Sequence, residues 1–345
     1  MATIYDVATR AGVSPATVSR VLNGVEVNGS MKEAVLEAAA ALQYVPNRTA
    51  RTLRRRTSEI IAMVIPDLEN PFFTSMTRAV AEQARASGYT VMLCDTAGRP
   101  DREAEYLRVM VSESVAGLIV APASDAIDLD EVIERGLPVV CVDRTAPGYD
   151  LDTVVVDNVG GARRSVEILQ KAGFRDIACI SGPEHVETAE QRTAGWREAV
   201  VAATGAAPDP AYDIRTSYSV SGGESAMNAL LDLPRPPDAV FAANNLLAVG
   251  SLRALSAHGL TPPAYGVLAF GDLPLLTYTP LGVVVVHLPS REIGEVAAAR
   301  LLERIDGFSG PARHIVLPNI VTDDQSAMEL LTSSGYPDPR PSAVG

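Results

Sequence analysis

The sequence predicts an all-α head followed by an α/β body made of two lobes. Helix-type patterns fill the first forty-odd residues, and from Glu59 onward short apolar runs alternate with helical patterns. The charge changes sign at the same place. With 345 residues and 47% apolar content, the chain is long enough to form several hydrophobic cores.

Residues 7–23 predict two short helices around a tight turn. Val7, Ala8 and Ala11 form one apolar stripe, Gly12 supplies the permissive backbone that ends the first helix, and Val13 is an apolar plug in the turn. This pattern is typical of a helix-turn-helix.

The second helix of the motif begins after Ser14, whose side chain can accept from the free backbone N–H groups of the first turn. Pro15 at the first helical position does no harm, because no helical carbonyl precedes it. Val18, Val21 and Leu22 face inward. The other face carries small or polar groups and Arg20, which can fork onto a guanine edge, so this helix is the expected recognition helix.

A third helix is predicted from about Ser30 to Leu42 and completes a head of residues 1–45. Five of the nine residues 48–56 are arginine, and no apolar face there is wide enough to bury. We expect residues 46–58 to form a hinge helix that is ordered only with DNA and a partner subunit. A solvated basic linker is the alternative.

The net charge of −13 is unevenly distributed. Residues 1–58 carry eight Lys and Arg against four acidic residues, a net +4, so the rest of the chain carries −17. This asymmetry suits a small DNA-facing head on an acidic body that DNA repels.

The body, about residues 59–333, reads as two series of buried strands separated by helices. The first series is Ile60–Ile65, Thr90–Cys94, Gly117–Val120, Pro138–Val142 and Val154–Val156. The second is Ile177–Ser181, Tyr212–Thr216, Ala239–Ala243 and Gly266–Phe270. Such alternation predicts parallel sheets flanked by helices on both faces. Ligands of open α/β sheets bind at the carboxyl ends of strands, which here indicates the cleft between the lobes.

The expected helices are Pro71–Ala86, Ala162–Ala172, Glu187–Ala203, Gly222–Leu231 and Leu246–His258. The strand Val283–His287, the helix Ser290–Ile305 and the strand His314–Leu317 are too few for a third lobe, so we expect them to return to the first. The first lobe then takes about residues 59–157 and 286–317, and the second about 158–285 and 318–333. Residues 334–345 are expected to be a disordered tail without leucine heptads, which favours a dimer over a tetramer.

Cys94, Cys141 and Cys179 lie in or beside apolar runs without metal spacing, so we expect buried, reduced thiols. The apolar runs are too short to cross a bilayer, and no basic segment followed by an apolar stretch opens the chain. We therefore expect a soluble cytoplasmic protein with no membrane partner.

The chain resembles the LacI/GalR (lactose-repressor) family of bacterial transcription regulators over nearly its whole length. The head shows Thr3–Ala8, Ala11–Ser14, Thr17–Asn23, Tyr44–Asn47 and Ala50–Leu53 in the family pattern. The body shows it in Ile65–Asp67, Asn70–Phe73, Asp143-Arg144, Val156–Asn158, Gly182-Pro183, Arg192 with Gly195-Trp196, Val240–Asn244 and Asp272–Pro274. The resemblance implies a periplasmic-binding-protein-like body and a repressor that binds a palindromic operator as a homodimer.

The resemblance also implies the DNA contacts. Base or phosphate contacts are expected from Tyr5, Ser14, Pro15, Ala16, Thr17, Ser19, Arg20, Asn23, Asn47, Arg51, Leu53 and Arg54. Paired hinge helices would enter the minor groove, where Leu53 would wedge into a central base step. For each of these residues, helix surface or capping is the alternative role.

In the cleft, the resemblance implies a small-molecule effector, a sugar or related metabolite, and no cofactor or metal. The expected contacts are Phe72, Phe73, Asp95, Arg144, Arg192, Tyr218, Asn244 and Asp272. Aromatic faces would stack on the ligand, and the polar groups would bind its hydroxyls. Two alternatives stay open, since Phe73 suits the core and Arg144 can pair with Asp143.

The chain departs from the family pattern at several positions. Ala269–Asp272 replaces Gly-Phe-Asp-Asp, Asn245 stands where Asp is usual, and Leu281-Gly282 replaces Pro-Pro. The remaining departures are His287–Pro289 in place of Arg-Gln-Pro, Asp323-Asp324 in place of Arg-Glu, and Asn28–Met31 in place of a Ser/Thr-rich capping box. All but the last lie in the body, so they bear on the effector rather than on DNA binding.

Two other classes of protein compete with the ligand-responsive regulator. The body alone would fit a periplasmic-type sugar-binding protein, but the basic head argues against it. An enzyme on the same α/β body would need a reactive constellation. The sequence shows no Gly-x-Gly-x-x-Gly after a strand, no P-loop, no Gly-x-Ser-x-Gly, and only four scattered histidines.

Ligand binding is expected to change the angle between the lobes and thereby operator affinity, in either direction.

Overall fold

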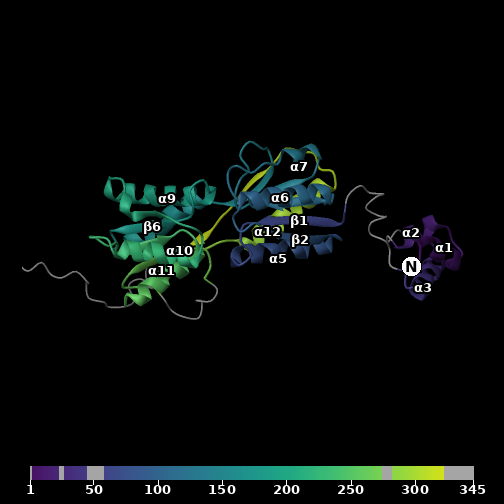
Figure 1. The fold of residues 1–345 in the computed structure, drawn as a ribbon, viewed down its shortest axis with the longest axis horizontal. Coiled ribbons are helices and arrows are strands. Elements are labelled where there is room, and N and C mark those ends of the chain that lie inside the picture. Colours follow the sequence, from purple (N-terminus) through teal and green to yellow (C-terminus); the bar gives the residue numbers. More distant parts are fainter. Residues whose placement is uncertain (1, 23–26, 45–57, 274–281, 322–345) are drawn as a thin grey trace, which may run out of the picture. The chain divides into compact units, whose positions relative to one another are not determined.

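The computed structural model describes residues 2–22, 27–44, 58–273 and 282–321. The chain separates into two compact units, 1–58 and 59–345, which are described one at a time. Figure 1 shows the elements of both.

The head contains three helices, α1 (Ile4–Ala11), α2 (Pro15–Leu22) and α3 (Gly29–Ala41). α1 begins with a reciprocal capping box between Thr3 and Asp6, and Gly12 ends it with a φ of 66°. The predicted cap of α2 is present, because Ser14 Oγ accepts from the backbone N–H of Thr17 at 3.1 Å. α3 is capped instead by Asn28, whose Oδ1 accepts from Ser30 N at 3.2 Å.

The head is held together by a small apolar core. Its buried members come from all three helices: Val7, Ala8, Val18, Val21, Val35, Ala38 and Ala39. Ala11 and Leu22, predicted to be inward-facing, are only partly buried at its edge. A core of this kind fixes the angle between α1 and α2, and so defines which face of α2 is left outside.

The first lobe of the body is a six-stranded sheet with helices on both faces. Its strands are β1 (Ile60–Ile65), β2 (Thr90–Asp95), β3 (Gly117–Val120), β4 (Val139–Val142), β5 (Asp152–Val156) and β11 (His314–Leu317), in the order β11-β5-β4-β3-β1-β2. All neighbouring pairs are parallel. The period-two alternation of β1 divides the core, because Ile61, Met63 and Ile65 pack under one face and Ala62 and Val64 under the other.

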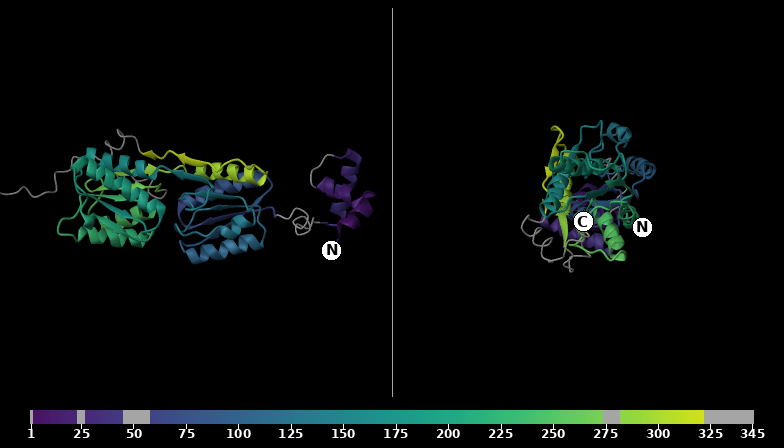
Figure 2. Two further views of the ribbon diagram at one scale, coloured as in Figure 1. Left: turned by 90° about the horizontal axis from the view of Figure 1, so that it is seen from above. Right: turned by 90° about the vertical axis from the view of Figure 1, so that its left-hand side faces the viewer.

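Helices α5 (Pro71–Ala86) and α12 (Ser290–Ile305) cover one face of this sheet, and α6 (Pro100–Ser112) and α7 (Asp130–Glu134) cover the other (Figure 1). Gly294 lets α12 approach α5 closely, since a Cβ there would meet Met76 O at 2.4 Å. α5 and α12 lie far apart in sequence, so this contact joins a late segment of the chain to the first lobe (Figure 2).

The second lobe repeats the arrangement. Its strands are β6 (Ile177–Ser181), β7 (Asp213–Arg215), β8 (Ala239–Ala242), β9 (Gly266–Phe270), β10 (Val283–His287) and β12 (Ile320–Val321), in the order β12-β10-β9-β8-β6-β7. Helix α8 (Asn158–Lys171) packs beside α9 (Glu187–Thr204), and α10 (Val220–Leu231) packs beside α11 (Asn245–Ala257). A 3-10 turn, η1 (Pro210–Tyr212), precedes β7.

The position of β10 corrects one sequence prediction. Val283–His287 belongs to the second sheet, where it pairs in parallel with β9 and antiparallel with β12. The chain therefore returns to the first lobe after β10 rather than before it. The strand is apolar throughout, so its residues fit either sheet, and only the pairing partners distinguish the two.

The chain crosses between the lobes after β5, after β10 and after β11. The first and third crossings are bonded together, because Asn319 Nδ2 donates to Asp157 O at 2.7 Å. Arg164 joins them, donating to Asn319 Oδ1 and lying 3.2 Å from Asp157 Oδ2. The connection between the lobes therefore consists of hydrogen-bonded crossing segments rather than one flexible link.

The predicted thiols are confirmed. Cys94, Cys141 and Cys179 are free and buried, and burial raises the pKa of Cys141 to about 12. None of the helices in the described ranges is long and apolar enough to span a bilayer.

Candidate functional site: a recognition helix and an interlobe cleft

The outer face of α2 combines one arginine with small side chains. Ala16 and Arg20 are four residues apart, lie on the same side of the helix and are exposed, whereas Val18 and Val21 face the core. Small side chains beside an arginine allow the helix to enter a major groove and present the guanidinium to a base edge.

The other predicted DNA contacts in the head are distributed around this face. Tyr5 of α1 is 69% exposed, and Ser14 is exposed at the start of α2. Pro15, Thr17 and Ser19 are half-buried, and the Thr17 and Ser14 hydroxyls lie 2.9 Å apart. Ser14 therefore has a capping role in addition to any DNA contact. Asn23, Asn47, Arg51, Leu53 and Arg54 lie outside the described residues, as does the predicted hinge helix.

The body contains a cleft of about 1000 Å³ between the lobes. It is lined from the first lobe by the segments that follow β1, β2 and β4, and from the second lobe by those that follow β6, β7, β8 and β9. These are the carboxyl ends of parallel strands, as expected for a ligand site in such sheets. All eight residues predicted to contact the effector lie on its wall: Phe72, Phe73, Asp95, Arg144, Arg192, Tyr218, Asn244 and Asp272.

Two phenylalanines form the aromatic part of the wall. Phe72 and Phe73 open α5, and their rings meet edge to face with centroids 5.0 Å apart. Phe73 is 5% exposed and packs in the first-lobe core, which supports the alternative of a core residue. Phe72 is only partly buried, so it is the ring better placed to stack on a ligand.

The two cleft arginines are held in different ways. Arg144 is anchored within its own lobe, with Nη1 donating to Pro122 O at 2.6 Å and Nε 3.2 Å from Asp143 Oδ2. This confirms the pairing that was the alternative for Arg144. Arg192 donates from Nε to Asn158 Oδ1 and from Nη1 to Ala243 O, and its guanidinium lies 4.3 Å from the centre of the Phe270 ring. Its burial lowers the pKa of Arg192.

Tyr218 carries a buried polar atom that the protein does not satisfy. Its hydroxyl makes no hydrogen bond within the described residues. The ring lies against Gly182, where a Cβ would come within 2.3 Å of it, so the tyrosine is held in place by close packing. A buried hydroxyl on a cleft wall that has no hydrogen-bond partner in the protein can bond to a polar group of a ligand.

Five carboxylates also line the cleft: Asp67, Glu69, Asp95, Asp143 and Asp272. Burial raises the pKa of Asp67, against the lowering effect of the Glu69 and Asn70 N–H groups that it accepts, and the charge of Asp95 adds to the rise. Asp272 Oδ1 lies 2.6 Å from His287 Nδ1, and this hydrogen bond raises the pKa of His287. Asp67 was not among the predicted site residues, although it follows β1 directly, which is the signal that would have identified it.

Asparagines on opposite lobes meet across the cleft. Asn244 caps α11, its Oδ1 accepting from Leu246 N at 2.7 Å, so only its amide NH₂ faces other groups. Asn245 donates from Nδ2 to Asn70 Oδ1 at 3.1 Å, and Asn70 caps α5. Asn245 departs from the family pattern, and in the structure it joins the two lobes through Asn70.

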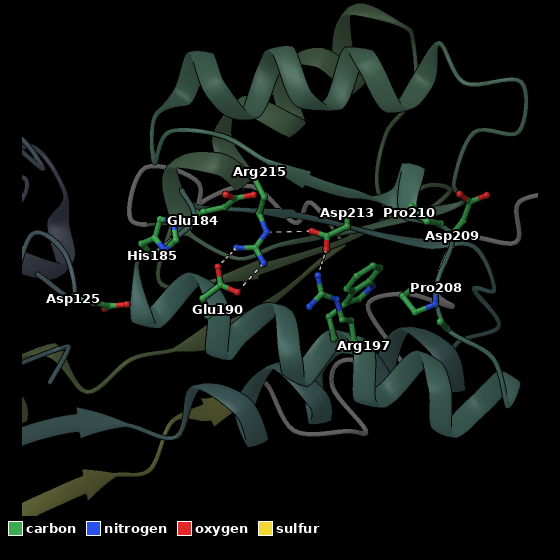
Figure 3. A pocket seen from close by; sticks show the side chains of 12 residues that line it. Asp125, Glu184, His185, Glu190, Arg197, Pro208, Asp209, Pro210, Asp213 and Arg215 are labelled. Carbon is green, nitrogen blue, oxygen red and sulfur yellow. Dashed lines mark hydrogen bonds and ion pairs between the residues drawn. The ribbon is translucent and has the colours of Figure 1, made fainter. Parts of the chain in front are cut away.

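A second cavity of about 680 Å³ lies beside β7 and α9 (Figure 3). Four of the charged groups that line it bind one another. Arg215 makes two hydrogen bonds to the carboxylate of Glu190 and one to Asp213, which also pairs with Arg197. Because both arginines of this cavity are already paired with its carboxylates, the cleft is the better candidate for the effector.

The helix-turn-helix head and the α/β body with its interlobe cleft together define a ligand-responsive DNA-binding regulator. Residues 3–47 match the bacterial regulatory proteins of the lacI family, and residues 58–323 match the periplasmic binding proteins and sugar binding domain of the LacI family. The chain belongs to the LacI family of bacterial transcription regulators.

Relatives of known name agree with this assignment. The transcriptional repressor CytR of Escherichia coli strain K12 is 32% identical over 89% of this chain and 90% of its own. The ribose operon repressor of Halalkalibacterium halodurans is 33% identical over 89% and 91%.

Solved structures agree as well. The Lac repressor dimer bound to operator and the anti-inducer ONPF matches with a TM-score of 0.80 and 25% identity, over 93% of this chain and 98% of that one. The complex of the regulator CelR with cellobiose matches with a TM-score of 0.70 and 28% identity, over 94% and 99%.

Proposed function

We propose that the chain is a homodimeric repressor that reads a palindromic operator with α2 and binds a neutral, polyhydroxylated metabolite in the interlobe cleft. A dimer places two recognition helices on two half-sites, and a relative is seen as a dimer on its operator. Its DNA target places its action in the cytoplasm, and we propose no catalytic role. Asn23, Asn47, Arg51, Leu53 and Arg54 are proposed to extend the DNA contacts.

The exposed Arg20 on an otherwise small-residue face of α2 carries the DNA-binding part of the proposal. Replacing it in the variant Arg20→Ala is expected to weaken binding to the protein's own upstream DNA by about 1–3 kcal/mol, because a bidentate base contact is lost. Fluorescence anisotropy at fixed, moderate salt measures the dissociation constant.

Arg10→Ala is the matched control for this variant. Arg10 is exposed at the end of α1 and carries the same charge, but it does not lie on the recognition helix. We expect Arg10→Ala to reduce affinity far less and equally for all sequences. Equal losses for Arg20→Ala and Arg10→Ala would contradict base reading by Arg20.

The unmet hydroxyl of Tyr218 carries the ligand part. The ligand is a neutral polyol in this proposal because carboxylates outnumber arginines on the wall and both arginines already have protein partners. A ligand hydroxyl would complete the hydrogen bonding of Tyr218, and Phe72 would supply an apolar face. A sugar or a nucleoside has both features.

A thermal-shift screen of sugars, nucleosides and sugar phosphates tests this proposal, because a compound that binds the folded state raises its melting temperature. We expect neutral polyols to raise it and sugar phosphates to have little effect. A panel in which only the phosphates stabilise the protein would contradict a neutral ligand.

Tyr218→Phe locates the binding site. The variant removes only a hydroxyl that has no hydrogen-bond partner among the described residues, so its unliganded stability should be equal or higher. Affinity for a compound found in the screen should fall about 3- to 10-fold. Tyr265→Phe is the control, since the Tyr265 hydroxyl is also buried and unmet but does not line the cleft. Unchanged affinity in Tyr218→Phe would exclude this hydroxyl as a contact.

A further inference from the structure

A continuous set of hydrogen bonds connects the lobe contact to the cleft. It starts in the first lobe at Thr145, which follows β4. Thr145 donates to Glu187 Oε2 in the second lobe twice, from its backbone N at 2.6 Å and from its hydroxyl at 2.9 Å. Glu187 is the first residue of α9, so this contact joins the lobes at the start of that helix.

The second carboxylate oxygen continues the chain of bonds. Gln191 Nε2 donates to Glu187 Oε1 at 2.8 Å, and Asn158 Nδ2 donates to Gln191 Oε1 at 2.9 Å. Asn158 Oδ1 then accepts from Arg192 Nε at 2.9 Å. We name Thr145, Glu187, Gln191, Asn158 and Arg192 the interlobe relay.

Chemistry fixes the direction of every bond in the relay. A carboxylate can only accept, and a guanidinium can only donate. Gln191 must therefore turn its NH₂ toward Glu187 and its oxygen toward Asn158, which leaves the oxygen of Asn158 for Arg192. The charge on Glu187 thus determines the orientation of two amides and provides Arg192 with its acceptor.

The position of Asn158 adds to this connection. It is the first residue of α8, directly after the first crossing between the lobes, and it is 2% exposed. Arg192 is 4% exposed, so an unpaired N–H there would be costly. Arg144, in contrast, has its bonds to described residues within the first lobe, whereas Arg192 is connected to the opposite lobe through the relay.

We infer that Glu187 is a positioning residue that couples closure of the lobes to the orientation of Arg192 in the effector cleft. When the lobes separate, Glu187 loses both Thr145 donors, so its carboxylate is no longer held in the position from which it orients Gln191 and, through Asn158, Arg192. This inference rests on the proposed role of Arg192 as an effector contact. It adds the residues through which lobe movement alters that contact.

Glu187→Gln tests whether the carboxylate of Glu187 sets the direction of the hydrogen bonds in the relay. The two Thr145 donors would take the single oxygen of the new amide, whose NH₂ would then face Gln191. Both downstream amides would have to reverse, so that Asn158 would present a donor to the Arg192 Nε–H. The double variant Glu187→Gln/Gln191→Glu reverses the bond between positions 187 and 191. It restores a carboxylate acceptor for Asn158 Nδ2, and with it the wild-type direction of the Asn158 and Arg192 bonds, at unchanged net charge.

The readout is hydrogen exchange in the ligand-free full chain, at the Thr145 amide and at Arg192 Nε–H observed by ¹⁵N NMR. Loss of one hydrogen bond should speed exchange at Arg192 about tenfold in Glu187→Gln, and the double variant should return it to the wild-type rate. Gln191→Met cuts the relay in its centre, so it should speed exchange at Arg192 and leave Thr145 protected. This variant carries the test if Glu187→Gln does not fold.

Glu190→Gln is the control. Glu190 lies in the same first turn of α9 but pairs with Arg215, so its loss should leave both signals unchanged. Wild-type exchange at Arg192 in folded Glu187→Gln or Gln191→Met, or failure of the double variant to restore it, would overturn the inference. Because no ligand is used, a failure to find any effector would affect the proposed function and not this result.

Discussion

Glu103 illustrates how a single buried carboxylate makes stability depend on pH. It lies on α6, is 2% exposed and accepts from Ala123 N at 2.7 Å, next to the cleft wall. Burial raises the pKa of Glu103 to about 7, against the lowering effects of that hydrogen bond and of the Arg144 charge. The folded protein therefore holds this proton more tightly than the unfolded chain does.

Because the folded pKa is the higher one, the contribution of Glu103 to stability falls as pH rises from about 4.5 to 7. Glu103→Gln keeps an acceptor for Ala123 without the charge. We expect its free energy of unfolding, relative to wild type, to increase by about 2 kcal/mol between pH 5 and pH 8. Urea unfolding at the two pH values measures the difference.

Glu105→Gln on the exposed face of α6 controls for the loss of one charge. A stability difference between Glu103→Gln and wild type that does not vary with pH would contradict titration of Glu103 in this range.

At the residue scale, local sequence patterns identify the residues that line the cleft, but not the hydrogen bonds that these residues form with one another. Seven of the eight predicted residues end or follow strands or lie at the start of helices, positions that a sequence shows directly. Arg192, in the second turn of α9, is the exception. The contact between Asn70 and Asn245 joins residues 175 positions apart, and no local pattern encodes it. Nor could the spacing on α6 show that the acidic Glu103 is buried.

At the scale of elements, glycines set the spacing of the second-lobe helices. α10 and α11 approach so closely that a Cβ on Gly250 would lie 2.1 Å from Val220 O and 2.5 Å from Glu224 N. Gly223 makes the reciprocal approach, 2.3 Å from Leu247 O. These neighbours are backbone atoms, which cannot move aside as a side chain can.

Gly250→Ala should therefore destabilise the body by about 1–3 kcal/mol through overpacking, despite the better helix propensity of alanine. Thermal or urea unfolding provides the measurement. Ser256→Ala on the exposed face of α11 is the control and should stay within about 0.5 kcal/mol of wild type. A neutral Gly250→Ala would mean that the two helices tolerate a wider separation.

The sequence predicted whether a segment forms a helix or a strand better than it predicted the sheet to which a strand belongs. The bounds of α5 and α12 agree with those predicted, because proline or serine at the start and apolar spacing along each helix are local signals. β10 was assigned to the wrong lobe because four consecutive valines fit any buried strand. Its neighbours β9 and β12 are known only from the folded arrangement.

At the scale of the whole molecule, two polar contacts between described residues join the lobes across the cleft: Thr145 with Glu187 and Asn70 with Asn245. The second depends on an amide donor, which the aspartate usual in the family would not provide. Asn245→Asp would place a carboxylate against the Asn70 oxygen, and we expect it to favour separated lobes.

Double electron–electron resonance, which measures the distance between two spin labels, can detect this separation. Spin labels at Glu134→Cys on the first lobe and Glu198→Cys on the second occupy exposed sites, while the native cysteines are buried. Asn245→Asp should lengthen or broaden the distance distribution, and Asn228→Asp on α10 should not. Identical distributions in all three proteins would show that the asparagine contact does not hold the lobes together.

The fold of the whole molecule followed from charge asymmetry, the turn motif and strand–helix alternation, whereas the coupling between its parts did not. The interlobe relay needs five residues from three separate segments, and its bond directions depend on their packing. The most direct measurement is therefore of coupling itself. It is a titration of operator DNA with the full chain, with and without a saturating cleft compound from the thermal-shift screen.

We expect that compound to change the operator dissociation constant by about fivefold or more, since couplings of this kind are typically 1–3 kcal/mol. Tyr218→Phe should require more compound for the same change. Equal operator affinity with and without saturating compound would contradict a regulator whose cleft controls its recognition helix.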